Sequence, residues 1–143
     1  MTREIMPTCV TLAEVEDMLA VWWADRQERY MQASKRTSEP MSNSRDLSAL
    51  ANLLTEHADD LGWCNYAWPD VKDLRHQAEA LVTASILSTS PDIGWKILEI
   101  LAKGKIHRVL RVESLFERLS RTLVHRIDAL RTLISMEKER YSR

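Results

Sequence analysis

The sequence has 143 residues, of which 45% are hydrophobic and 29% are charged, with only 3 Gly and 4 Pro. This length is enough to bury a core without disulfides or a structural metal, and the composition excludes a disordered or β-rich chain. We therefore expect an all-α protein in one domain over residues 1–143, a bundle of about five helices with a long C-terminal helix.

The charge is segregated along the chain although the formal net charge is only −1. Residues 1–70 hold 6 of the 20 Lys and Arg residues but 12 of the 21 Asp and Glu residues. The first half is thus acidic and the second half basic. This pattern biases which surface attracts phosphates and which attracts cationic partners.

The two cysteines, Cys9 and Cys64, and the N-terminus indicate the compartment. The chain has no secretory signal pattern and no apolar stretch approaching 18 residues. We expect a soluble, cytoplasmic protein with reduced thiols and no membrane contact.

The first helix is predicted from about residue 12 to about residue 33. Thr11 and Glu14 form a capping box, and the apolar residues that follow keep helical spacing. Trp22 and Trp23 point about 100° apart, so one indole is expected at the edge of the core or at an interface. Because Trp is enriched at binding hot spots and the other face of this helix is acidic, a partner-binding surface is predicted here. It comprises Asp17, Trp23, Asp25 and Glu28.

Four further helices are predicted after a mobile Ser/Thr-rich connection over about residues 34–45. The first runs from about Asp46 to Leu61, where Gly62 caps it. Residues 62–70 hold three aromatics in a loop that either plugs the core or binds a ligand. The next helix starts at Asp70, and an apolar helix that begins at Ser90-Pro91 and ends near Gly104 is expected in the middle of the bundle.

The last helix is the longest, from about residue 105 or 114 towards residue 139. Its apolar side chains recur every three or four positions along roughly six turns. A stripe of this length can extend beyond the neighbouring helices, so we expect its distal end to contact a second copy of the chain in a homo-oligomer. The stripe comprises Val112, Phe116, Leu119, Leu123, Ile127, Leu130 and Ile134.

Basic side chains on the last two helices form a predicted nucleic-acid surface. Residues spaced two turns apart share a solvent-facing ridge that can follow a phosphate backbone of RNA or single-stranded DNA. The alternative is a solvated helix face with local ion pairs such as Glu117 with Arg121. The predicted set is Lys103, Lys105, Arg108, Arg111, Arg118, Arg121 and His125.

Arg118 and His125 also have a spacing of interest, since six residues separate them. This spacing resembles the Arg-x(4–6)-His signature of HEPN domains, which are small, all-α and usually dimeric. The resemblance implies metal-independent RNA cleavage, with His125 as acid/base and Arg118 steadying the phosphate.

A group of acids and histidines, Glu56, His57, Asp59, Asp60 and His76, lies around Cys64. The group has no His-Glu-x-x-His or Cys-x-x-Cys pattern, so a solvated acidic helix end is expected, with no metal, no cofactor and no catalytic residue. Acids at a helix C-terminus oppose the helix dipole. Asp59 and Asp60 are therefore expected to meet a Lys or Arg of this chain or of a partner.

These observations favour a non-enzymatic helical subunit of a larger assembly, with a protein partner on the acidic half and nucleic acid on the basic helices. In size, all-α content and basic seam the chain is similar to the small helical subunits of CRISPR surveillance complexes, a likeness of fold alone. One alternative is a protein-only binder such as an inhibitor, an antitoxin or a phage-type regulator (an anti-defence protein). The second alternative is the HEPN-like ribonuclease.

Overall fold

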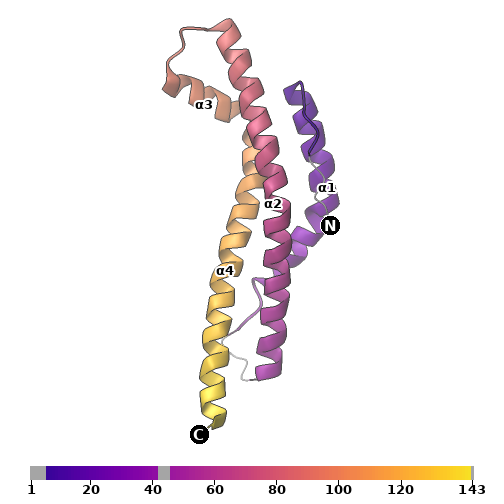
Figure 1. Cartoon of the computed structure of the whole chain (residues 1–143), viewed down its shortest axis with the longest axis vertical. Helices are drawn as coiled ribbons and strands as arrows, with labels where there is room; N and C mark the ends of the chain where they lie inside the picture. The colour runs from indigo at the N-terminus through magenta and orange to yellow at the C-terminus, as the bar shows by residue number, and fades with distance from the viewer. Residues whose placement is uncertain (1–5, 42–45, 143) are drawn as a thin grey trace. The chain divides into compact units, whose positions relative to one another are not determined.

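The computed structural model describes residues 6–41 and 46–142. These residues form four α-helices and no strand: α1 (Leu12–Arg36), α2 (Leu47–Thr89), α3 (Trp95–Lys105) and α4 (His107–Ser142) (Figure 1). The all-α class is confirmed, and the expected number of about five helices is corrected to four. Part of the predicted connection, residues 42–45, lies outside the described residues, and Ser34 to Arg36 still belong to α1.

The two helices predicted on either side of residues 62–70 are one continuous helix, α2. Gly62 does not cap a helix, and Pro69 lies inside α2. Buried residues continue through the segment at steps of three and four: Cys64, Ala67, Val71 and Leu74. This packing outweighs the backbone hydrogen bond that Pro69 removes. The predicted aromatic loop is therefore wrong.

Two compact units make up the structure, and α1, α2 and α4 each contribute to both of them. The first unit comprises Met1–Arg26 and Ala67–Leu115. Its core includes Val15, Leu19 and Trp22 of α1 and Val71 and Leu74 of α2. The Thr11 half of the predicted capping box is confirmed, because the Glu14 backbone N–H donates to Thr11 Oγ1 at 3.2 Å. The Glu14 carboxylate accepts instead from the backbone N–H of Val10, one residue before Thr11, at 2.8 Å.

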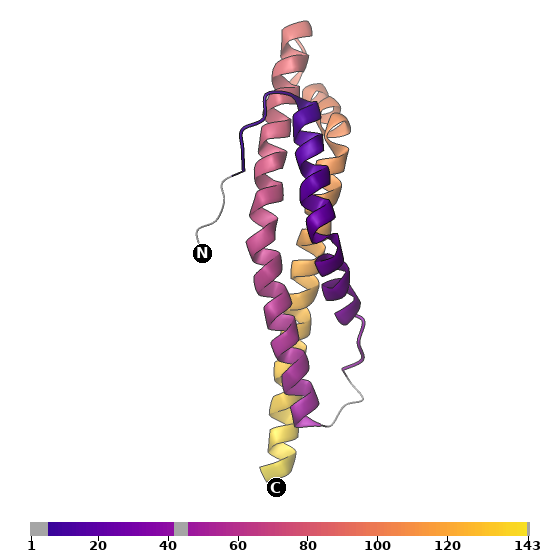
Figure 2. The ribbon, with the colours of Figure 1, turned by 90° about the vertical axis from the view of Figure 1, so that its right-hand side faces the viewer.

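The second unit comprises Gln27–Tyr66 and Phe116–Arg143. The start of α2 and the later part of α4 lie side by side in it (Figure 2). Phe116 is fully buried, with its ring centroid 5.5 Å from that of Tyr30 and 5.6 Å from that of Trp63. The predicted stripe of α4 is confirmed here, since Leu119, Leu123, Ile127 and Leu130 are also buried.

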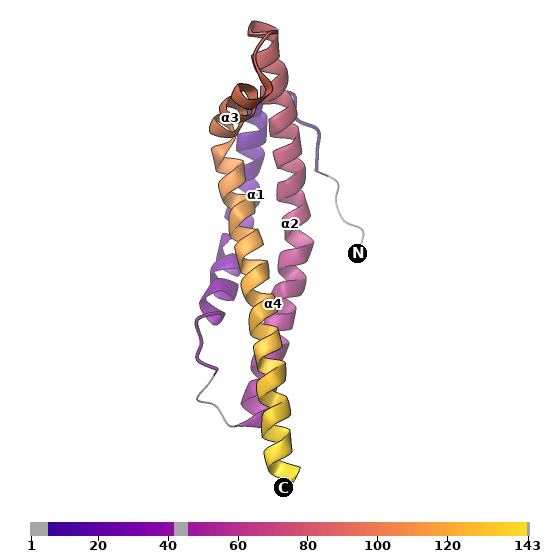
Figure 3. The same ribbon diagram turned by 90° about the vertical axis from the view of Figure 1, so that its left-hand side faces the viewer.

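Helix α3 belongs to the first unit and is joined to α4 by Ile106 alone (Figure 3). It begins at Trp95 instead of Pro91 and ends at Lys105, close to the predicted end. Only Leu98 and Ala102 of α3 are buried. The expected place in the middle of the bundle is wrong, because the other apolar side chains of α3 are exposed: Trp95, Ile97, Ile100 and Leu101.

Candidate functional site

Four of the predicted nucleic-acid contacts lie in the first unit: Lys103 and Lys105 of α3, and Arg108 and Arg111 of α4. All four side chains are exposed. Lys103 Nζ lies 3.0 Å from a carboxylate oxygen of Glu99, and Arg108 lies 3.9 Å from Glu16. Exposed pairs of this kind are weak and exchange readily with other anions.

The other three, Arg118, Arg121 and His125, lie on α4 in the second unit. All three are exposed, and they fall within an arc of about 60° on the side of α4 turned away from its buried stripe. Arg121 pairs with Glu117 at 2.9 Å, as the alternative interpretation predicts. We name Arg118, Arg121 and His125 the α4 ridge.

The predicted partner-binding residues all lie on α1. Asp17, Asp25 and Glu28 are exposed, whereas Trp23 is half-buried and its neighbour Trp22 is buried against Asp70, to which its indole N–H donates at 3.2 Å. Helical geometry puts Trp23 about 120° from Asp17. In the first unit, Asp17 and Asp25 therefore lie on a different side of α1 from the indole of Trp23.

A buried polar cluster in the second unit joins three helices. His57 and Asp60 of α2 are both 0% exposed, so the predicted solvated helix end is wrong for these two residues, and α2 does not end here. Glu56 and Asp59 are exposed as predicted. The Asp60 carboxylate accepts hydrogen bonds from Arg29 at 2.5 Å and from Arg36 at 2.7 and 2.8 Å. The expectation that Asp60 meets an Arg of this chain is confirmed, and both partners belong to α1.

His57 contacts α4 in the same cluster. Its Nε2 accepts a hydrogen bond of 2.9 Å from the guanidinium of Arg126. A nitrogen that accepts carries no proton, so the ring is neutral and its hydrogen lies on Nδ1, which is buried without a hydrogen-bond partner among the described residues. Arg126 also donates to the backbone carbonyl of Glu39 at 2.7 Å.

The environment of the cluster shifts two pKa values. Burial, together with the charge of Arg126, lowers the pKa of His57 below its ordinary 6.5. Burial alone would raise the pKa of Asp60, but the hydrogen bonds from Arg36 and Arg29 outweigh it and the pKa is lowered. Both shifts favour the ionisation states that the hydrogen bonds require.

Metal binding finds no support in this cluster. Within residues 6–41 and 46–142, no three His, Cys, Asp or Glu side chains are grouped so that they could hold a metal ion. Cys64 is a buried thiol whose Sγ lies 3.4 Å from the carbonyl of Phe116, and burial raises its pKa to about 11. A thiol with this pKa is neither a ready ligand nor a nucleophile at neutral pH.

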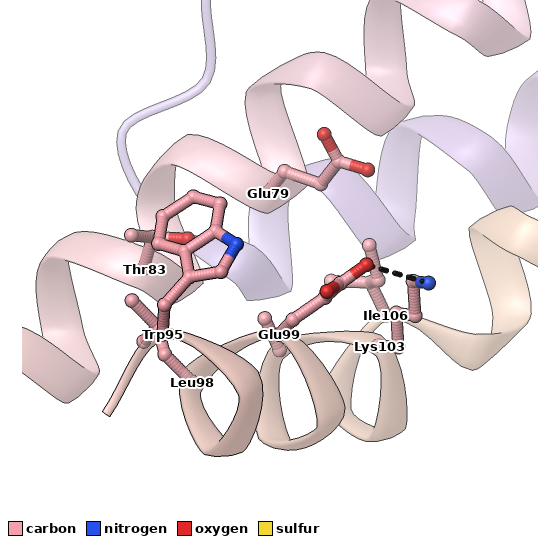
Figure 4. A pocket seen from close by; sticks show the side chains of 8 residues that line it. Glu79, Thr83, Trp95, Leu98, Glu99, Lys103 and Ile106 are labelled. Atoms are coloured by element: carbon pink, nitrogen blue, oxygen red, sulfur yellow. Dashed lines mark ion pairs between the residues drawn. The ribbon is translucent and has the colours of Figure 1, made fainter. Parts of the chain in front are cut away.

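A cavity of about 210 Å³ in the first unit was not predicted (Figure 4). Leu98, Ala102 and Ile106 give it apolar walls, and Glu79 and Thr83 of α2 face the Trp95 indole and the Glu99 and Lys103 pair of α3. It is smaller than the cavities that hold drug-sized ligands, which begin at about 300 Å³.

None of the helices in the described part of the chain has the length and apolar character needed to cross a membrane. Comparison of the chain with protein-family models, with curated proteins and with solved structures gives no match.

Proposed function

We propose that this chain is a non-enzymatic helical subunit of a larger assembly, which contacts the phosphates of a nucleic acid through exposed basic side chains of α3 and α4. In this proposal the acidic residues of α1 contact a protein. The observation that supports it is the α4 ridge, where two arginines and a histidine share the solvent side of one helix.

The exposed basic side chains of the second unit on α4 include arginines, which suit phosphate binding better than lysines do. Arg126 is part of the buried cluster with His57, whereas Arg118 and Arg121 are exposed. A guanidinium binds phosphate through two parallel hydrogen bonds, which a lysine cannot offer. Arginines spaced along one helix side can thus meet successive phosphates of a strand.

The test is a titration of the full chain into labelled single-stranded RNA, followed by fluorescence anisotropy across a salt series. The proposal expects the logarithm of the affinity to fall linearly with the logarithm of the salt concentration. R118Q/R121Q should weaken binding and reduce the slope by about 1.4, since each lost phosphate contact removes about 0.7 on a single strand.

Arg131 offers a matched control on the same helix of the same unit. Its side chain is 69% exposed, against 67% for Arg121, and it also has an acidic neighbour, Asp128. It lies about 140° around the helix from Arg118, about 80° from Arg121 and about 120° from His125, outside the arc of the α4 ridge, so R131Q should bind as the wild type does. Absence of binding at low salt, or equal effects of the ridge variant and R131Q, would contradict the proposal.

The protein-only binder is the second candidate, and the exposed Asp17 and Asp25 favour it. Function lost only in variants of the α1 acids, with the ridge variants intact, would support this candidate over nucleic-acid contact. The same RNA samples, run on a denaturing gel, test the ribonuclease alternative. RNA that stays intact with the wild type and with H125A excludes it.

A further inference from the structure

Helix α3 is apolar on two sides, although only one of them is buried. Leu98 and Ala102 face the first unit, whereas Ile97, Ile100 and Leu101 are 57%, 70% and 45% exposed. Helical geometry gathers these three side chains within an arc of about 100°. We name them the outer face of α3. Together they expose on the order of 300 Å² of apolar surface, the size of the largest patch on many monomers, which is often functional.

Lysines surround this face. Lys96, Lys103 and Lys105 are exposed, and Glu99 is the single acid of α3. Gly104 lies among the apolar side chains, and a Cβ added there would meet nothing within 4 Å. The surface is therefore apolar at its centre, positive at its edges and open at one end. Its complement is a surface with acids around small apolar residues.

The first unit of this chain presents such a complement on α1. Asp17, Ala20, Val21 and Ala24 are exposed on the side of α1 opposite its buried residues, and Val21 is 65% exposed. Asp25 is exposed beside them. We name these residues the outer face of α1. Its alanines allow a second helix to approach closely, and its aspartates can pair with lysines.

We propose that the outer face of α3 in one copy of the chain packs against the outer face of α1 in a second copy. Charge selects this pairing over α3 with α3, which would place the three lysines of each helix opposite three more. The same side chains are exposed within one copy, so the contact has to be made between copies.

This interface is heterologous, since each copy donates a different surface. Every copy keeps one α1 face and one α3 face, so association continues beyond a dimer unless a ring closes. The apolar patch is smaller than the roughly 800 Å² that each partner buries in a standard interface. We therefore expect weak, concentration-dependent association in the micromolar range or above, strongest at low salt.

The inference does not depend on the proposed nucleic-acid contact, and the test uses the full chain without RNA. Sedimentation velocity over a concentration series should show the weight-average mass rising above that of the monomer. I97S/I100S on α3 and D17K/D25K on α1 should each stay monomeric over the same range. An equimolar mixture of the two variants should form a dimer and stop there, because each variant brings the one intact face that the other lacks.

Two control variants address the specificity of the faces. Trp95 is 75% exposed but lines the cavity on the other side of α3, so W95S should associate as the wild type does. D59K/E139K changes the net charge as much as D17K/D25K does, at exposed positions of the second unit, and should also associate normally. Circular dichroism verifies that each variant is folded.

Three results would overturn the inference. A wild-type chain that is monomeric at all concentrations would leave the outer face of α3 to a different protein. A D17K/D25K variant that associates like the wild type would show that α1 is not the complement. A mixture of the two variants that stays monomeric would show that the faces do not meet. R118Q/R121Q should associate normally, which separates this test from the RNA titration.

Discussion

At the scale of single residues, His57 and Asp60 connect α2 to α4 and α1 through hydrogen bonds. Both occupy positions of α2 that apolar residues fill elsewhere in the helix, and both are fully buried. Their partners, Arg29, Arg36 and Arg126, stand on other helices at sequence separations of 31, 24 and 69 residues. No local pattern links residues so far apart, so the sequence predicted an arginine or lysine partner for Asp60 but not which one.

Among the residues that the structure describes, Asp60 is the acid that neutralises both Arg29 and Arg36 through direct hydrogen bonds. D60N keeps the side-chain shape but leaves the two guanidinium groups, 31% and 28% exposed, without a direct counter-charge. We expect the free energy of unfolding to fall by about 2–4 kcal/mol, measured by urea denaturation. The neighbouring, exposed Asp59 provides the control, since D59N should change it by less than about 0.5 kcal/mol.

His57 predicts a pH dependence of stability. The unfolded state takes up a proton near pH 6.5, whereas the folded state does so only at lower pH, because protonation would turn Nε2 from an acceptor into a donor facing Arg126. Below about pH 6.5 the unfolded state therefore binds more protons, and stability falls as the pH falls. The acids near His57, Asp60, Glu39 and Glu56, oppose this shift without reversing it.

Urea denaturation at a series of pH values between about 7.5 and 5 tests this dependence. H57Q keeps an oxygen that accepts from Arg126 and does not titrate, so the decline below about pH 6.5 should be smaller in this variant. H125Q, at an exposed histidine, should keep the wild-type profile. Asp60 affects stability in a separate pH range. Its pKa is lowered in the folded state, so its contribution to stability is lost only as the pH falls below about 3.8. Equal profiles for the wild type and H57Q would rule out His57 as the source.

At the scale of elements, the predictions succeeded where one strong pattern acted alone. The Thr11 cap of α1 and the apolar stripe of α4 are both found as expected. The continuity of α2 was missed because Gly62 and Pro69 are strong local signals, while Cys64 and Ala67 are small and give a weak hydrophobic pattern. Tertiary packing of these small residues keeps α2 helical through residues 62–70.

Helix α3 was misjudged for a different reason. Its apolar residues occupy more than one side, and periodicity cannot tell a buried helix from one with an exposed apolar face. The sequence did find the exposed basic side chains of α4, because charged residues opposite an apolar stripe face solvent. It could not indicate that Arg126, one position after His125, turns inward to His57.

Gly62 provides a direct test of the continuous helix. A helix that ended there would need Gly62 in the left-handed region, where a side chain is strained. In the described chain no glycine has a positive φ, and a Cβ at Gly62 would meet nothing within 4 Å. G62A should therefore raise the free energy of unfolding by about 0.5–1 kcal/mol, measured by thermal or urea denaturation. A loss of stability would instead indicate that Gly62 caps a helix and that residues 62–70 form a loop.

At the scale of the whole molecule, the segregation of charge allows one chain to carry surfaces of opposite sign. In the first unit, exposed aspartates of α1 and exposed lysines of α3 coexist, although the net charge of the chain is −1. A chain with this pattern attracts its own copies and anionic polymers with the same lysines. RNA binding and self-association would therefore use the same two side chains, Lys103 and Lys105. Both belong to the predicted nucleic-acid set and also border the outer face of α3.

This competition predicts that RNA shifts the association equilibrium. A phosphate strand that occupies Lys103 and Lys105 removes the positive edge which the aspartates of α1 require. At a protein concentration where copies associate, excess single-stranded RNA should release RNA-bound monomers, observed by sedimentation with a labelled strand. K103Q/K105Q should weaken both association and RNA binding, whereas R118Q/R121Q should weaken only RNA binding. Assemblies that grow when RNA is added would contradict this prediction. They would mean that the strand bridges copies through the α4 ridge, while the lysines of α3 stay paired with the aspartates of α1 in a second copy.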